Sequence, residues 1–196
     1  MGEIKSALEL ALERTAGVQG DKKSVEEYEH KQKGKRLLSQ LTENPKLDIK
    51  KELNQYKGEE RKWVVDGFVE VALSNIALPT TEADLGRLDP IRNGLATALG
   101  KKAEIEYLFD QAHQLLTQYL ENRQQLIEHV RNQFAQRIRQ KEEELARQYG
   151  SSVRLDPAQD PEFAGVLQQN MRQLQGQYQQ VLDQLREEVR RLHQKG

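Results

Sequence analysis

The chain has 196 residues, of which 36% are hydrophobic and 31% charged, and its net charge is −1. Basic and acidic residues balance in both halves, 16 against 17 up to Gly100 and 14 against 14 after it, which argues against a nucleic-acid-binding domain of the basic type. There is no cysteine, so disulfides, thiolate nucleophiles and cysteine-ligated metals are excluded. No run approaches the ~18 apolar residues of a membrane span, and Glu3, Glu9 and Glu13 interrupt any signal-peptide core. We therefore expect a cytoplasmic protein that contacts no membrane.

The first residues carry a helical pattern. Apolar side chains recur on one face over residues 3–16, which predicts a short amphipathic helix closed by Gly17 and Gly20. Ser24 and Glu27 have the spacing of a capping box, which predicts that a second helix starts there and runs to about residue 41.

The same opening carries a family resemblance. Residues 3–10 read Glu-Ile-Lys-Ser-Ala-Leu-Glu-Leu and residues 13–15 read Glu-Arg-Thr. This run resembles the start of an uncharacterised bacterial protein family. The resemblance implies a bacterial origin and no particular function.

A basic cluster lies in the second predicted helix, formed by Lys31, Lys33, Lys35 and Arg36. Such a cluster is typical of a nucleic-acid or phosphate contact. Glutamates at residues 27 and 29 stand four positions before Lys31 and Lys33, where they form stabilising helix pairs. We favour a solvated helix face. Nucleic-acid binding through this cluster and the arginines of residues 101–196 stays as an alternative.

Several short helices follow. Asn44-Pro45 predicts a new helix that ends at Gly58, and residues 63–78 predict a core helix around Trp63 with some strand character. Thr81 and Asp84 predict a capped short turn, and residues 89–99 predict a further helix. Residues 1–100 therefore form a predicted domain, a small helical bundle.

The longest predicted helix covers residues 101–149, which contain no proline and no internal glycine. Of the 23 glutamines, 19 lie after residue 101. Asp160-Pro161 predicts the start of a final helix whose apolar residues follow a coiled-coil spacing. Residues 101–196 are therefore predicted to be a long antiparallel helical hairpin with a loop at 150–161.

The hairpin has a predicted register. If the two helices fold back on each other about the loop, Tyr178 lies near Phe134. The final helix then ends level with the point where the broad apolar face of the 101–149 helix begins. A two-stranded hairpin with so narrow a seam is marginal alone, because each ordered residue costs ~1–2 kcal/mol of backbone entropy. We therefore expect a homodimer or higher oligomer formed through this region.

No catalytic or cofactor motif is found. Glu106, Asp110 and His113 share one helix face, but a diiron bundle needs a second such motif, so no metal and no cofactor are predicted. An unrecognised enzyme site in the N-terminal bundle, near Trp63 and His113, stays as an alternative.

The sequence thus predicts an all-α, non-enzymatic protein-interaction or scaffold module with an unknown protein partner. The candidate contacts lie in the hairpin and its tip: Phe134, Ile138, Tyr149, Phe163 and Tyr178.

Overall fold

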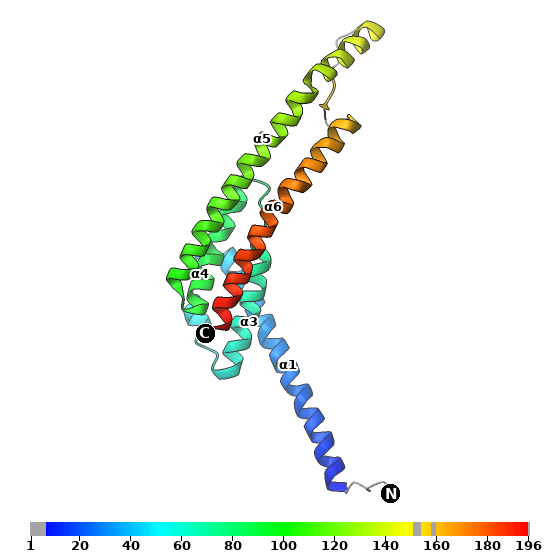
Figure 1. Ribbon diagram of the computed structural model, residues 1–196. Coiled ribbons are helices and arrows are strands. Elements are labelled where there is room, and N and C mark those ends of the chain that lie inside the picture. The colour runs from blue at the N-terminus through cyan, green and yellow to red at the C-terminus, as the bar shows by residue number, and fades with distance from the viewer. Residues whose placement is uncertain (1–6, 151–153, 158–159, 196) are drawn as a thin grey trace. The chain divides into compact units, whose positions relative to one another are not determined.

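The computed structural model describes residues 7–150, 154–157 and 160–195, with side chains from residue 22 onward in these ranges. The described residues contain no strand, and the prediction of an all-α fold is confirmed. Figure 1 shows the elements, whose bounds are α1 (Ala7–Glu43), α2 (Ile49–Leu53), α3 (Gly58–Asn75), the 3-10 helix η1 (Glu82–Arg87), α4 (Leu88–Leu99), α5 (Lys102–Tyr149) and α6 (Pro161–Gln194).

The chain forms two compact units, each assembled from segments that are distant in the sequence. Unit 1 comprises Met1–Ile76, Asp89–Tyr107 and Val189–Gly196, and unit 2 comprises Ala77–Leu88 and Leu108–Glu188. The sequence suggests a single division after residue 100, and that domain assignment stays a prediction.

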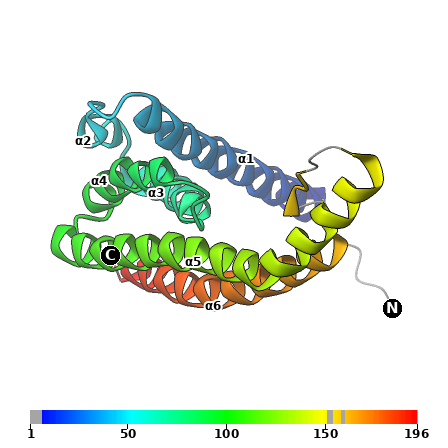
Figure 2. The same cartoon turned by 90° about the horizontal axis from the view of Figure 1, so that it is seen from above.

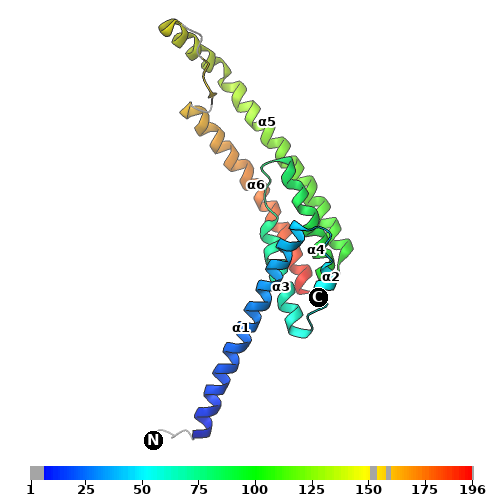
Figure 3. The same ribbon diagram turned by 180° about the vertical axis from the view of Figure 1, so that it is seen from behind.

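Helix α1 is one continuous helix, so the predicted break at Gly17 and Gly20 is wrong. A glycine inside a helix costs only ~1 kcal/mol relative to alanine, and good helix formers on both sides outweigh that cost. The first half of α1 extends beyond α3 (Figures 1 and 3). Residues 3–6 of the predicted first helix lie outside the described part of the chain.

Two glycines bring α1 and α3 into close contact inside unit 1. A Cβ atom at Gly34 would overlap the carbonyl oxygen of Val64, and one at Gly67 would overlap the carbonyl oxygen of Lys31. The two backbones therefore meet directly, with no side chain between them. The apolar core of unit 1 contains side chains with 2% exposure or less, among them Leu38, Leu53, Phe68, Ala72 and Leu95.

The connection between α1 and α3 differs from its predicted form. The predicted helix start at Asn44-Pro45 is wrong, because Asn44 instead forms a turn in which its carbonyl accepts from Leu47 N at 3.0 Å. Helix α2 begins later, where Asp48 Oδ1 accepts from Lys51 N at 3.0 Å. Gly58 opens α3 with φ +55° and does not end the preceding helix. Figure 2 shows α2 at the end of α1.

The predicted capped turn at Thr81 and Asp84 is confirmed at the start of unit 2. Asp84 Oδ2 accepts from the backbone N–H groups of Thr80 and Thr81 at 2.9 and 3.0 Å, and η1 follows. The hydroxyl of Thr80 and these two N–H groups hold the pKa of Asp84 well below its usual range. Arg123 of α5 donates to the carbonyl oxygen of Thr80 at 2.9 Å. This segment is thereby tied to α5.

Helices α5 and α6 run side by side in opposite directions (Figures 1 and 2), as the sequence predicts. Their register is not the predicted one. The ring of Tyr178 lies 5.3 Å from that of Tyr119, which is fifteen residues before Phe134. Phe134 instead meets Phe163, with ring centroids 5.6 Å apart.

The connecting loop explains this register. Leu155 N donates to Glu142 Oε1 at 2.8 Å, so Leu155 lies beside α5 about two turns before the end of that helix. Lys141 Nζ then lies 2.6 Å from Asp160 Oδ2 at the start of α6. Helix α6 consequently reaches along the broad apolar face of α5 and does not stop where that face begins.

Candidate functional site

Four of the five predicted contact residues pack inside unit 2. Phe163 is 4% exposed, Ile138 8% and Tyr178 9%, and Phe134 is half-buried against Phe163. Asn122 Nδ2 also donates to the hydroxyl of Tyr178 at 2.6 Å. These side chains form the seam between α5 and α6, which accounts for their apolar character. Tyr149 differs, because its side chain is 68% exposed at the end of α5.

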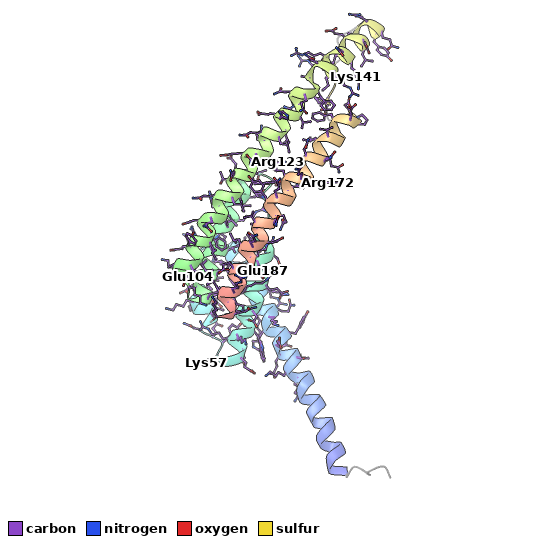
Figure 4. The ribbon with its side chains drawn as sticks, viewed as in Figure 1. Lys57, Glu104, Arg123, Lys141, Arg172 and Glu187 are labelled. Atoms are coloured by element: carbon purple, nitrogen blue, oxygen red, sulfur yellow. The ribbon has the colours of Figure 1, made fainter. Side chains whose placement is uncertain are left out.

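The described part of the predicted tip is held to α5 by charge. Asp160 caps α6, since its Oδ1 accepts from Glu162 N at 3.0 Å, and its Oδ2 faces Lys141 (labelled in Figure 4). The hydrogen bond from Lys141 lowers the pKa of Asp160 to about 2. Arg137 forms an ion pair with Glu162 on the same side. Residues 151–153 and 158–159 of the tip lie outside the described residues.

Beside the seam, the hairpin has a groove that no predicted contact residue identified. It consists of two open depressions of about 490 and 540 Å³ between α5 and α6. The first is lined by Leu108, Gln111, Gln114, Leu115, Gln118, Val181, Gln184, Leu185 and Glu188. The second is lined by Asn122, Gln125, Leu126, His129, Asn170, Gln173, Leu174 and Gln177.

The two depressions follow one line, which we call the hairpin groove. On α5 its positions alternate spacings of three and four residues, through Leu108, Gln111, Leu115, Gln118, Asn122, Gln125 and His129. The α6 side keeps the same alternation, through Asn170, Leu174, Gln177, Val181, Gln184 and Glu188. This is the spacing with which helices pack side chains into one another.

The lining of the hairpin groove is almost uncharged. Of its 17 residues, nine are amides, six are leucine or valine, and Glu188 and His129 are the remaining two. In the whole chain, 31% of residues are charged. The groove could have been recognised in the sequence from glutamines at heptad spacing. Several of the glutamines that are enriched in the second half of the chain line it.

The basic cluster of α1 is largely paired. Lys31 Nζ lies 2.6 Å from Glu27 and Lys35 Nζ lies 3.1 Å from Glu70, while Lys33 Nζ stands 5.6 Å from the ring centre of Tyr56. The hydrogen bond from Lys31 to Glu27 raises the pKa of Lys31. Arg36 is exposed.

The residues named in the metal and enzyme questions are all described, and the enzyme alternative itself stays untested. They contain no group of three or more histidine, cysteine, aspartate or glutamate side chains arranged to hold a metal ion. Trp63 is buried, with its ring 5.9 Å from that of His30, and His113 is an exposed residue of α5. None of the described helices has the length and apolar content needed to cross a membrane.

Comparison with known proteins gives a family and no function. No curated protein and no solved structure shows significant similarity to the chain. A family model described as a family of unknown function (DUF6657) matches residues 50–191. The predicted resemblance to an uncharacterised family is confirmed, although the match lies in this region and not in the first fifteen residues. Since the match covers most of its length, the chain belongs to this family of unknown function, DUF6657.

Proposed function

We propose that this protein is a non-enzymatic helical scaffold that self-associates, with the hairpin grooves of two copies packed against each other. The observation that carries the proposal is the hairpin groove, a heptad-spaced surface on which four of the six apolar side chains remain half-buried or exposed. Two hairpins that meet at this surface form an antiparallel four-helix bundle.

Packing energetics support a second pair of helices. Val181 is 45% exposed and Leu115, Leu126 and Leu174 are half-buried, although all four line the hairpin groove. Full burial of one such side chain contributes about 1.5–3 kcal/mol. The groove extends from Leu108 to His129, which is roughly 30 Å at ~1.5 Å per residue. That length suits a helix–helix interface of three heptads.

The lining favours a second copy over a charged partner. Each glutamine or asparagine side chain carries both a donor and an acceptor, so an amide surface complements itself. A charged helix in this groove would lose hydration for its ions without gaining an opposite charge. Most soluble homo-oligomers are symmetric, and a two-fold axis brings the same surface patch of both subunits into the interface.

The charged surfaces elsewhere give less support to nucleic-acid binding. Lys31 and Lys35 lie beside glutamates, and on the hairpin Arg137 and Arg186 lie beside Glu162 and Asp183. Such pairs leave little net positive charge for phosphate. A cytoplasmic location in a bacterium completes the proposal, supported by the absence of cysteine and by the opening resemblance.

The test is the mass of the full-length chain in solution at micromolar concentration, by sedimentation equilibrium. We expect about 45 kDa, twice the 22.6 kDa of one chain. The double variant Leu115→Glu, Val181→Glu places two charges in the groove and should give a folded protein of monomeric mass, because buried like charges repel. The control Gln124→Glu, Gln180→Glu makes the same charge change at exposed positions outside the groove lining and should stay dimeric.

Two results would overturn the proposal. One is a monomeric mass for the unmodified chain throughout the micromolar range. The other is an oligomer whose mass responds equally to the groove variant and to its control.

A further inference from the structure

Unit 1 contains a pocket of about 710 Å³ that the proposed function does not use. Three elements form it: the first turns of α3, the last turn of α4 and the last turn of α6. Its lining residues are Gly58, Arg61, Lys62, Val65, Asp66, Ala98, Leu99, Leu192, His193 and Gln194. The volume lies within the ~300–1,000 Å³ that ligand pockets occupy.

The wall contributed by α6 is fixed by two polar contacts. His193 Nε2 lies 2.7 Å from Asp66 Oδ1, and each of the two side chains is about a quarter exposed (24% and 25%). Lys101 Nζ donates to the carbonyl oxygen of Leu192 at 2.5 Å. These two contacts fix the position of the third wall within unit 1.

The lining combines an apolar surface with positive charge. Val65, Ala98, Leu99 and Leu192 supply the apolar surface, and Val65 is buried. Arg61 and Lys62 supply two cations against the one carboxylate of Asp66, which already faces His193. Among the described residues, no carboxylate lies within ion-pair distance of Arg61 or Lys62, and the guanidinium of Arg61 donates to Asn54 Oδ1 at 3.2 Å.

We infer that this pocket binds a small organic carboxylate with an apolar body. Arg61 and Lys62 receive the carboxylate, while Val65, Leu99 and Leu192 cover the aliphatic or aromatic part. A cationic ligand fits worse, because the one acidic group is already engaged by His193. A polyphosphate fits worse as well, since two cations do not balance several charges and Asp66 repels them. The inference stands independently of self-association.

The test uses sodium octanoate as the probe and full-length ¹⁵N-labelled protein. We expect saturable shifts of the backbone amide signals of Lys62, Val65 and His193, with one octanoate bound per chain. Octylammonium, which has the same apolar body and the opposite charge, should leave these signals unchanged at the same concentrations.

Two variants locate the site. Arg61→Gln with Lys62→Gln should weaken octanoate binding about tenfold or more, because charge-assisted hydrogen bonds are lost. Lys46→Gln with Lys50→Gln removes two exposed lysines outside the pocket lining and should leave the affinity unchanged. Ala98→Trp fills the pocket while keeping both cations, and it should abolish binding. The circular dichroism of each variant checks that it is folded.

Three results would overturn the inference. The first is no saturable shift with octanoate up to about 10 mM. The second is equal binding of octylammonium. The third is unchanged octanoate affinity in folded Arg61→Gln, Lys62→Gln or in folded Ala98→Trp protein.

Discussion

The α1–α3 crossing and the α5–α6 hairpin are two solutions to packing one helix on another. At Gly34 and Gly67 the backbones of α1 and α3 meet directly, and Val64 and Phe68 are buried beside them. Between α5 and α6, tyrosines and phenylalanines hold the helices apart, as with Tyr119 and Tyr178. At this crossing the first interface is buried within unit 1. The second leaves the hairpin groove along its side.

The difference shows how residue size sets what a helix pair leaves uncovered. Glycines allow close approach, so neighbouring large side chains close over the contact. Aromatic residues fill the space between two helices, and beside them Leu115, Leu126 and Leu174 stay half-buried while most of the groove amides are exposed. We therefore expect the crossing to tolerate no added atoms and the hairpin to tolerate them well.

The largest effect should come from Gly67→Ala. The added Cβ would meet the backbone of Lys31, which cannot move without separating α1 from α3. We expect a loss of about 3 kcal/mol or more, at the upper end of overpacking. Chemical denaturation followed by circular dichroism measures it. Gly34→Ala should behave alike, since its Cβ would meet Val64.

The matched control is Gly176→Ala in α6, where nothing lies within 4 Å of the added Cβ. Alanine is the better helix former, so this variant should gain about 0.5–1 kcal/mol. A stabilising Gly67→Ala, or a strongly destabilising Gly176→Ala, would remove the distinction between the two interfaces.

A smaller loss is expected at the centre of the seam. Leu182 of α6 is fully buried, and its neighbours in the sequence pattern, Tyr178 and Leu185, are buried as well. Leu182→Ala should cost about 2–3 kcal/mol, near the lower end for such a change, because the adjacent groove lets the cavity relax. Gln180→Ala, an exposed change in the same turn, should leave the free energy of unfolding nearly unaltered.

The hairpin loop should respond to acid. The pKa of Asp160 falls from 3.8 to about 2 on folding, so its carboxylate contributes stability above pH about 4 that is lost as the pH falls towards 2. Asp160→Asn should flatten the pH dependence of hairpin unfolding in that window. Glu143→Gln, which removes an exposed carboxylate of α5, should preserve it. Asp84 also titrates at low pH, so some slope should persist in both variants.

The smallest effect concerns Thr117, whose hydroxyl oxygen is buried without a hydrogen-bond partner among the described residues. Thr117→Val removes the unsatisfied group and keeps the shape of the side chain. It should stabilise the protein by less than about 1 kcal/mol in denaturant unfolding. A loss of stability would mean that the hydroxyl has a partner, such as water.

Local chemistry made much of the fold predictable. The caps at Asp84 and Asp160 follow from residue type and spacing, and the 48 residues of α5 follow from the absence of breakers. The register was not predictable, because it depends on how Leu155 and Asp160 return to contact Glu142 and Lys141. The predicted helix break at Gly17 and Gly20 was wrong, because the free-energy cost of a glycine is small compared with the stability of a long helix.

The two sites were harder to predict than the helices. The hairpin groove is lined by amides, which carry no catalytic signature, and it needs the correct register to be recognised. Asp66 and His193 lie 127 residues apart, and each alone is an ordinary polar residue on a helix. Their pairing follows from where α6 ends, which again depends on the register.

One crosslinking measurement tests the central claim most directly. The chain has no cysteine, so a single introduced thiol reports one position. Gln118 lies near the middle of the hairpin groove, whereas Gln124 is exposed and outside the groove lining, ~120° around α5.

If two grooves overlap fully, Gln118 lies at the same level as its own copy, across helices ~8–10 Å apart. Gln118→Cys treated with a short bismaleimide should then give a covalent dimer in high yield, and Gln124→Cys should not. Equal yields at the two positions, or no covalent dimer at Gln118→Cys, would contradict groove-to-groove self-association.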